Sequence, residues 1–256
     1  MFLVNNDRFL PSSCNNNEYI KMFWVGLMDG NGIIQVNHWR YQSLQYRLVI
    51  KLSNIISNYN MLIKIAKVIK GNIRITGKGK EVIWVVNDKE TIKEIIKIFE
   101  IYPLLTSKKI CQLEFLKKCL LKNSINWYLS NRNFKYANQI VIIKSDIFGL
   151  ERNSFFLPDY FKEWLSGFIE AEGCFSIRKN NNHSFSIGQN FDIYLINAIK
   201  QYFEIQNLVK NPYPNFFSIE VYKKEILNKI IDHCYSYPLL GEKAESLKKF
   251  NQIFNK

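Results

Sequence analysis

The chain is poor in the residues that build metal centres, disulfide frameworks and membrane anchors. Its five cysteines are scattered without a CxxC pair, and its three histidines have no nearby partner set. We therefore expect neither a zinc site nor a disulfide framework. We expect the protein to reside in a reducing compartment. Apolar runs such as 48–52 and 140–143 are short and broken by lysine, so they cannot span a bilayer. The N-terminus resembles neither a signal peptide nor a transit peptide.

Negative charge is also scarce relative to positive charge. The 256 residues include 35 Lys and Arg against 22 Asp and Glu, a formal net charge of +13. No basic amphipathic segment stands apart as a membrane-surface anchor, so this excess predicts a nucleic-acid partner. Glycine and proline number only 11 and 6, beside heavy use of Ile, Asn, Lys, Phe and Tyr. That usage indicates an AT-rich gene.

Two landmarks occur twice, in the same order and at nearly the same spacing. Residues 23–32 read FWVGLMDGNG, and residues 164–173 read WLSGFIEAEG, an alignment without a gap. Residues 102–108 read YPLLTSK, and residues 237–243 read YPLLGEK. Such paired landmarks indicate an internal duplication. We expect a loose arm at 1–17, a first half-domain at 18–122, a linker at 123–158 and a second half-domain at 159–256.

Each copy shows the same order of periodic segments. A short apolar helix leads into a segment of alternating apolar and polar residues, which predicts a strand with one buried face. The apolar residues of this segment are Ile34 and Val36 in the first copy and Phe175 and Ile177 in the second. In the first copy we expect further segments at 46–52 (strand), 60–70 (helix), 72–76 and 82–86 (strands), and 89–99 and from 108 (helices). In the second copy they fall at 183–188 (strand), 193–203 (helix), 216–222 (strand), and 224–235 and from 243 (helices). The predicted class is α+β: two pseudo-symmetric halves, each an antiparallel four-stranded sheet with helices on one face.

Small residues lie four apart in both copies of the first helix. They are Gly26 and Gly30 in one copy, and Gly167 and Ala171 in the other. Residues at this spacing share a helix face, and small ones let two backbones approach closely. The pattern predicts that the two helices pack against each other about a pseudo-twofold axis.

This packing would bring together the residues at the ends of the two helices, Asn31 and Glu172. Acidic side chains also stand at Asp29 and Glu170. The helix macrodipole disfavours acids at a C-terminus, so their presence in both copies predicts a functional role. Carboxylates on a rigid scaffold beside a basic surface suit metal-assisted phosphodiester hydrolysis. The alternative is that these acids have no catalytic duty.

Residues 24–32 (WVGLMDGNG) and 165–173 (LSGFIEAEG) resemble the LAGLIDADG motif. The chain is similar, from about residue 20 onward, to the single-chain members of the LAGLIDADG homing endonuclease and intron maturase family. The resemblance implies a saddle of two four-stranded sheets over the DNA major groove, with divalent metal, usually Mg²⁺, bound between Asn31 and Glu172. It also implies catalytic contributions from Lys108 and Lys243, near the scissile phosphates, and from Gln189, which would order the catalytic water. The first copy has Leu52 at the position of that glutamine.

Asn31 departs from the family pattern, because an amide brings no charge to a site for a hard divalent cation. We expect weaker metal binding and impaired cleavage of at least one strand. One reading is a monomeric endonuclease or nicking enzyme acting on double-stranded DNA. The others are a cleavage-inactive maturase acting on group I intron RNA, and a non-catalytic ribonucleoprotein component. The resemblance and the AT-rich composition suggest an organelle-encoded, mitochondrial protein.

Polar residues on the expected strands and loops are candidates for nucleic-acid contact, because Arg, Lys, Asn and Gln on β-ribbons can contact base edges and phosphates. Loops 76–80 and 178–182 suit phosphate contact, although the first also suits a plain hairpin turn. Each residue taken singly could equally be ordinary solvated surface. The five tryptophans are expected in packing rather than base stacking. The candidates are Gln35, Asn37, Arg47, Lys51, Arg74, Lys78, Lys80, Ser176, Arg178, Lys179, Asn180, Ser186 and Tyr222.

Overall fold

The computed structural model describes residues 16–145, 147–150, 155–178 and 182–254, and it confirms the predicted class. The first half-domain comprises α1 (Asn17–Asn31), β1 (Gly32–Trp39), β2 (Ser43–Ser53), α2 (Ile56–Ile69), β3 (Asn72–Thr76), β4 (Glu81–Val86), α3 (Lys89–Ile101) and α4 (Ser107–Lys122). The second comprises α7 (Phe161–Glu172), β5 (Cys174–Ser176), β6 (Ser184–Asn190), α8 (Ile193–Tyr202), β7 (Lys210–Tyr213), β8 (Phe216–Val221), α9 (Lys224–Ser236) and α10 (Glu242–Phe254).

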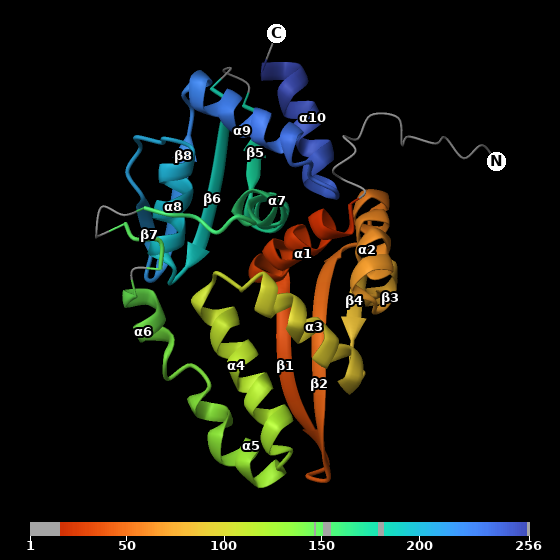
Figure 1. Ribbon diagram of the computed structural model, residues 1–256. Coiled ribbons are helices and arrows are strands. Elements are labelled where there is room, and N and C mark those ends of the chain that lie inside the picture. Colours follow the sequence, from red (N-terminus) through yellow and green to blue (C-terminus); the bar gives the residue numbers. More distant parts are fainter. Residues whose placement is uncertain (1–15, 146, 151–154, 179–181, 255–256) are drawn as a thin grey trace, which may run out of the picture.

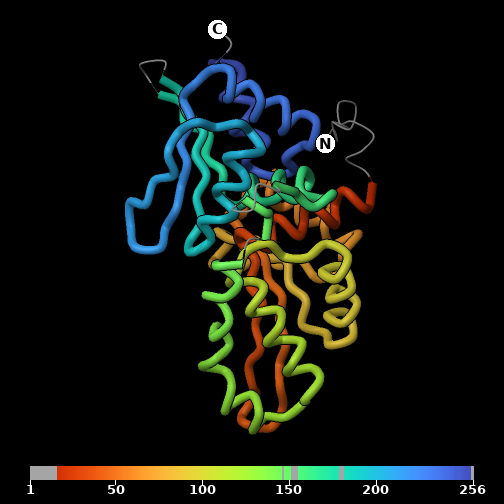
Figure 2. Tube along the Cα trace, turned by 60° about the vertical axis from the view of Figure 1, so that its left-hand side comes forward, coloured from red at the N-terminus to blue at the C-terminus, as the bar shows by residue number. Residues whose placement is uncertain are grey.

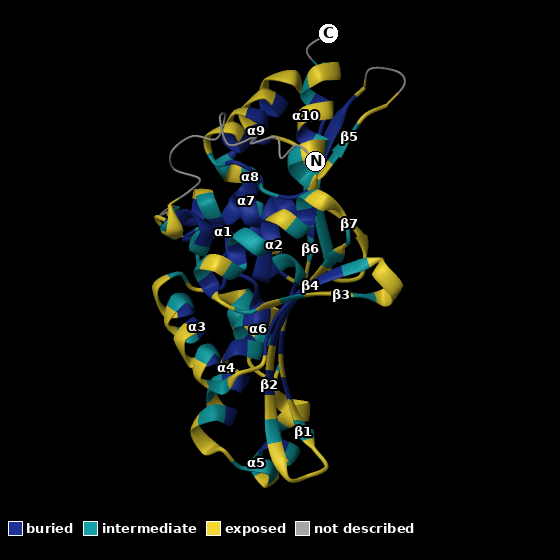
Figure 3. Ribbon diagram, turned by 90° about the vertical axis from the view of Figure 1, so that its right-hand side faces the viewer, coloured by how far each residue is buried: buried dark blue, intermediate teal, exposed yellow. Residues whose placement is uncertain are grey.

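Each half-domain contains one four-stranded antiparallel sheet. The strand orders are β1-β2-β4-β3 and β5-β6-β8-β7, so the two copies share one topology. In Figure 1 the two halves lie one above the other, and α1 and α7 meet between them. Figure 3 shows the strands on one side of the molecule and most of the helices on the other. Within the described residues, one face of each sheet is therefore free of helices, and we call it the open face.

The alternation in the sequence sets which strand residues face the helices. In β1, Ile34 and Val36 are buried, whereas Gln35 and Asn37 are exposed. Strand partners share a face, and Gln35 pairs with Arg47 across β1 and β2. The buried faces pack on aromatic clusters in the two halves. Trp24, fully buried, contacts Trp84 and Phe99 with ring centroids 5.6 and 5.0 Å apart.

The two motif helices approach so closely that only glycine fits at two positions. A Cβ atom on Gly26 would lie 1.8 Å from the carbonyl oxygen of Trp164, and one on Gly167 would lie 1.8 Å from that of Phe23. Both obstacles are backbone atoms of the partner helix, which a rotamer change cannot move. The predicted contact between the helices at Gly26 and Gly167 is present.

The segment between the half-domains contains short helices and contributes no strand among its described residues. It contains α5 (Ile125–Asn131), the 3₁₀ turn η4 (Arg132–Phe134) and α6 (Gln139–Lys144). Figure 2 shows this stretch in green, running along the first half-domain toward the second. Trp127 stacks on Phe115, and the Tyr128 hydroxyl donates to the carbonyl of Val36 at 3.2 Å. The segment therefore packs against the first half-domain.

Three details differ from the sequence-based expectation. Strand β7 was not predicted, because it is short, exposed and contains Pro212, features of an edge strand. Strand β5 ends at Ser176, and Ile177, expected on a buried face, is 45% exposed. The expected arm reaches residue 17, but Asn16 caps α1 by accepting from the amide of Glu18. The rest of that arm, 1–15, lies outside the described residues.

Among the described residues, no helix is both long and apolar enough to cross a membrane. The cysteines in this part of the chain, Cys111, Cys119, Cys174 and Cys234, are free thiols.

Candidate active site and nucleic-acid interface

The ends of α1 and α7 meet at the centre of the molecule. A Cβ atom on Gly30 would lie 2.2 Å from the Cβ of Ala171 and 3.2 Å from the Cγ of Glu172. The Glu172 side chain thus lies against α1, next to the residue that precedes Asn31. Close packing of small residues therefore brings the end of α7, which carries Glu172, against the end of α1, which carries Asn31.

Glu172 is the acid of this centre whose charge is not already used in helix capping. Burial raises its pKa, while the nearby ammonium groups of Lys109 and Lys243 act in the opposite direction. Asn31 lines a pocket of about 230 Å³ together with Lys51, Leu52 and Lys243. Residues from both half-domains therefore share the centre, and Lys243 is common to the surroundings of Glu172 and Asn31.

Lys109 is a charged residue of this centre that sequence reasoning missed. Its side chain is buried, and Nζ donates to the carbonyl oxygen of Gly32, the residue directly after Asn31. Burial lowers the pKa of Lys109, opposed by the carboxylates of Asp29 and Glu172. Lys108, the predicted catalytic lysine, is exposed at the start of α4. The two lysines are adjacent in α4 and differ only in the side of the helix on which they lie, so no sequence signal distinguished them.

Asp29 and Glu170 form structural caps, which corrects the expectation that their position implies catalysis. Asp29 accepts hydrogen bonds from the amides of Leu105 and Thr106 at 2.8 and 3.0 Å and from the indole Nε1 of Trp164 at 2.8 Å. Glu170 accepts from the amides of Leu240, Gly241 and Lys243, at the start of α10. Each acid lies in the last turn of its own motif helix and accepts from amides at or just before the start of a second helix, α4 or α10, where the positive end of that helix dipole favours a carboxylate.

Replacing Asp29 with asparagine should destabilise the fold by at least about 2 kcal/mol. The amide would leave one or more buried donors without an acceptor, and each such donor costs about 1–3 kcal/mol. The measurement is the free energy of unfolding in urea. Asp88→Asn is the matched control: Asp88 caps the exposed start of α3 through the Thr91 amide. Asn and Asp are equivalent at such caps. Equal stability of the two variants would contradict the capping role.

Gln189, predicted to order a catalytic water, lies next to the end of β6. It is half-buried, pairs with Phe217, and its Oε1 accepts from the amide of Asn190 at 2.9 Å. In the aligned motifs Ile33 corresponds to Cys174. Ile33 pairs with Val49 and Cys174 pairs with Ser186, so Leu52, three residues after Val49, is the counterpart of Gln189 on β2. The two copies therefore differ at this position as well as at Asn31. The catalytic role of Gln189 stays a prediction.

The centre supplies oxygen ligands suited to a hard divalent ion. Glu172 offers a carboxylate and Asn31 an amide oxygen, but no group of three or more His, Cys, Asp or Glu side chains gathers within the described residues. Mg²⁺ is commonly bound by one or two carboxylates together with waters and substrate phosphates. The donor set therefore fits an ion that DNA phosphates help to bind, rather than one held by protein ligands alone.

The open face of the first sheet carries the predicted contact residues of that half. Gln35 and Asn37 on β1, with Arg47 on β2 and Arg74 on β3, line a groove of about 680 Å³. Lys51 shares the face and pairs with Glu81 at 2.7 Å. Lys78 and Lys80 are exposed at the β3–β4 turn, built on the 3₁₀ turn η3 (Gly77–Gly79). The structure thus places all seven predicted residues on one side of the sheet or at its turn.

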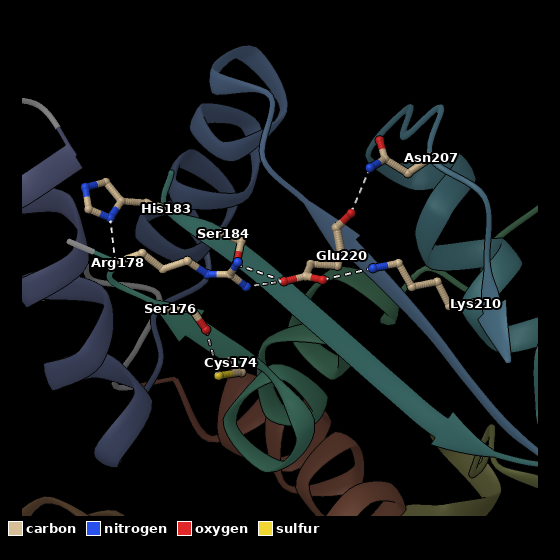
Figure 4. Close-up of polar contacts among 8 residues, drawn as sticks. All are labelled: Cys174, Ser176, Arg178, His183, Ser184, Asn207, Lys210 and Glu220. Atoms are coloured by element: carbon tan, nitrogen blue, oxygen red, sulfur yellow. Dashed lines mark hydrogen bonds and ion pairs between the residues drawn. The ribbon is translucent and has the colours of Figure 1, made fainter. Parts of the chain in front are cut away.

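The second sheet carries fewer basic groups and a cluster around one acid. Ser176 and Ser186 belong to β5 and β6, and Arg178 follows β5. The Arg178 guanidinium lies over the Tyr222 ring, 5.4 Å from its centroid. It also pairs with Glu220 (Figure 4). The predicted contacts Lys179 and Asn180 lie outside the described residues.

The tip of the β1–β2 hairpin corrects one expectation. Trp39, predicted to lie in packing, is 50% exposed, and the Arg40 guanidinium lies 5.0 Å from its ring centroid. His38 stacks on Tyr41 beside it, with ring centroids 4.3 Å apart. Trp24, Trp84 and Trp164 are fully buried, as expected. Trp39 was misassigned because it ends β1 next to the hairpin turn, a position that its residue type alone does not reveal.

The chain belongs to the LAGLIDADG endonuclease family, whose model matches residues 24–119 and 165–254, one match for each half. It is 53% identical to a probable intron-encoded endonuclease aI3 of Debaryomyces hansenii, over 96% of this chain but 40% of that protein. It is 48% identical to a probable intron-encoded endonuclease aI3 of Dictyostelium citrinum, over 93% of this chain and 96% of that protein. The chain thus spans less than half of the first relative and nearly all of the second.

Solved structures share the two-sheet arrangement. The LAGLIDADG meganuclease I-AabMI bound to uncleaved DNA superposes with a TM-score of 0.67 at 25% identity, covering 92% of this chain and 90% of that one. The I-LtrWI homing endonuclease bound to target DNA gives 0.70 at 23% identity, covering 94% and 91%. I-SmaMI, bound to an uncleaved DNA target in the presence of calcium ions, gives 0.69 at 17% identity, covering 92% and 90%.

Proposed function

We propose that this chain binds a long double-stranded DNA target as a monomer and hydrolyses its phosphodiester bonds, with double-strand cleavage impaired by Asn31. The observation that supports this most directly is the placement of Glu172, Asn31 and Lys243 at the junction of the two half-domains. Strands β1 and β2 run away from this junction (Figure 1), and the open face of their sheet carries amide and basic side chains. The DNA complexes of the structurally similar I-AabMI and I-LtrWI agree with this use of the fold.

The metal in this proposal is Mg²⁺, which Glu172 and Asn31 would hold. When bound, it would stabilise charge on the phosphate and activate water. The protein contributes Glu172 as the anionic ligand and Lys243 as a nearby positive charge. Asn31 adds an oxygen without charge, so one side of the centre is expected to bind metal weakly and to cleave its strand slowly.

The proposal is tested on a supercoiled plasmid carrying the sequence that flanks the site where the chain's own gene is inserted. We expect magnesium-dependent nicking at that sequence, with little linear product, and no cleavage in EDTA. Separation of the product strands identifies which strand is cut. Duplex binding without cleavage at any magnesium concentration would remove the enzymatic proposal and leave DNA binding.

Binding to the same duplex should weaken steeply with salt. Each phosphate contact releases counterions, so six to ten contacts would lower the affinity by about 10³- to 10⁵-fold between 50 and 200 mM salt. Lys78→Gln should reduce the slope of log K against log salt by about 1. Lys93→Gln is the control, because Lys93 lies on α3 and pairs with Glu90. A slope near zero in the parent protein would exclude a nucleic-acid partner.

The second candidate function is a maturase that assists splicing of a group I intron without cutting DNA. Asn31 favours it, because a scaffold that only binds RNA has no need of two acids. Tighter binding of the intron RNA than of any duplex would support it over the endonuclease. In either case we propose a mitochondrial location, which imaging of a tagged copy or organelle fractionation would test.

A further inference from the structure

An acid stands on the open face of the second sheet, in a protein whose proposed partner is a polyanion. Glu220 lies in β8, and its side chain is 21% exposed. Oε1 accepts from the Arg178 guanidinium at 2.8 Å and from the Ser184 hydroxyl at 3.2 Å, while Oε2 pairs with Lys210 at 3.0 Å. Figure 4 shows the carboxylate between the two cations. An acid in this place repels DNA phosphate unless ion pairs with neighbouring cations offset its negative charge.

The cluster holds Arg178 in one orientation. Its guanidinium is fixed at one end by Glu220 and lies over the ring of Tyr222, with 5.4 Å between the guanidinium carbon and the ring centroid. Its backbone amide donates to Nδ1 of His183 at 3.1 Å, which anchors the main chain beside the sheet. A free arginine loses much rotamer entropy when it binds, so an arginine held in advance binds at lower cost and with a defined direction.

The fixed guanidinium keeps donors for a ligand. Arginine has five N–H donors, and the pair with Glu220 engages one nitrogen, Nη2. The side chain of Arg178 is 44% exposed, twice the exposure of Glu220. Both carboxylate oxygens of Glu220 already accept hydrogen bonds, so the acid is poorly placed to contact a cytosine amino group itself. Arginine donors in the major groove match the O6 and N7 acceptors of guanine.

We propose that Arg178, oriented by Glu220 and Tyr222, reads a guanine in the major groove at one base pair of the half-site bound by the second sheet. This inference rests on the proposed DNA-binding function and adds a base identity to it. Arg178 is the specificity residue, and Glu220 is its positioning residue. The corresponding ion pair on the open face of the first sheet has a different cation. There Glu81 pairs with Lys51, whose ammonium group is a point charge without the planar fork of donors that an arginine offers.

The test is a selection from duplexes in which each base pair of the target is varied in turn, scored by relative affinity. The parent protein should prefer guanine by about 5- to 150-fold at one position of the second half-site. Arg178→Lys keeps the charge but loses the planar fork. It should remove most of that preference while leaving the salt dependence and the other positions unchanged.

Glu220→Gln tests the positioning role. It should weaken the preference at the same base pair only, and raise overall affinity slightly because a negative charge has been removed. Glu225→Gln is the matched control: Glu225 pairs with Lys223 at 2.7 Å at the start of α9. It removes the same charge but should leave the selection profile unchanged. Unfolding curves establish that the variants are folded.

The outcomes separate this inference from the function on which it rests. A parent protein that selects no duplex sequence contradicts the proposed DNA-binding function. A parent that selects a target, with Arg178→Lys keeping every preference, contradicts the inference alone. Equal weakening of all targets by Arg178→Lys would make Arg178 a phosphate contact and overturn the guanine assignment.

Discussion

Replacing Asn31 with aspartate should raise magnesium-dependent double-strand cleavage by about 10²-fold or more. The second carboxylate would complete the anionic ligand set opposite Glu172, and a bound metal stabilises the transition state by several kcal/mol, each 1.36 kcal/mol being a factor of ten in rate. The side chain would lie in the pocket that it now shares with Lys243, so no rearrangement of the helices is needed. The measurement is the rate of linear product formation from a plasmid target, at several magnesium concentrations.

Glu172→Gln is the counterpart of this variant and should abolish whatever cleavage the parent shows. Asn31 precedes Gly32 in a pair prone to deamidation, so the mass of that peptide must be checked before residual cutting is credited to the asparagine form. A parent that already cuts both strands cleanly would show that the missing charge matters less than argued. No gain in Asn31→Asp, with tight binding to intron RNA, would favour the maturase.

Placing a larger side chain at Gly26 should cost the fold at least about 3 kcal/mol, at or beyond the upper end of ordinary overpacking. The added Cβ would lie 1.8 Å from the Trp164 carbonyl oxygen and 2.9 Å from the Phe168 amide nitrogen, so the helices α1 and α7 must separate. Separation would expose apolar residues of both half-domains. Gly26→Ala already tests this, and Gly26→Leu should prevent folding.

The measurement is the free energy of unfolding in urea, compared with Gly79→Ala. A Cβ on Gly79 meets nothing within 4 Å, although the φ of +87° is unfavourable for alanine. Gly79→Ala therefore measures the cost of backbone strain alone, about 1–3 kcal/mol. The steric conflict between two helices is present only in the Gly26 variants. Unchanged stability in Gly26→Leu would mean that the central helix contact is wrong.

Much of this molecule is determined by its sequence alone. The duplicated landmarks establish two equivalent halves, and the period-two alternation assigns Ile34 and Val36 to the core and Gln35 and Asn37 to the open face. The spacing of Gly26 and Gly30 predicts the helix contact. These inferences succeed because periodicity and side-chain size act locally, through the fixed geometry of helices and strands. The short exposed strand β7 escaped them because an edge strand containing proline has no apolar period.

Only the tertiary structure decided what the charged residues do. Asp29 and Glu172 are both acids near the end of a motif helix, yet Asp29 is buried against the amides of Leu105 and Thr106, more than 70 positions away in the chain. Lys109 rather than Lys108 lies buried beside Gly32. A charge is stabilised by whichever donors and opposite charges the packed elements place around it, and those partners come from distant segments. Sequence can therefore name the candidate charges, but their roles follow from packing.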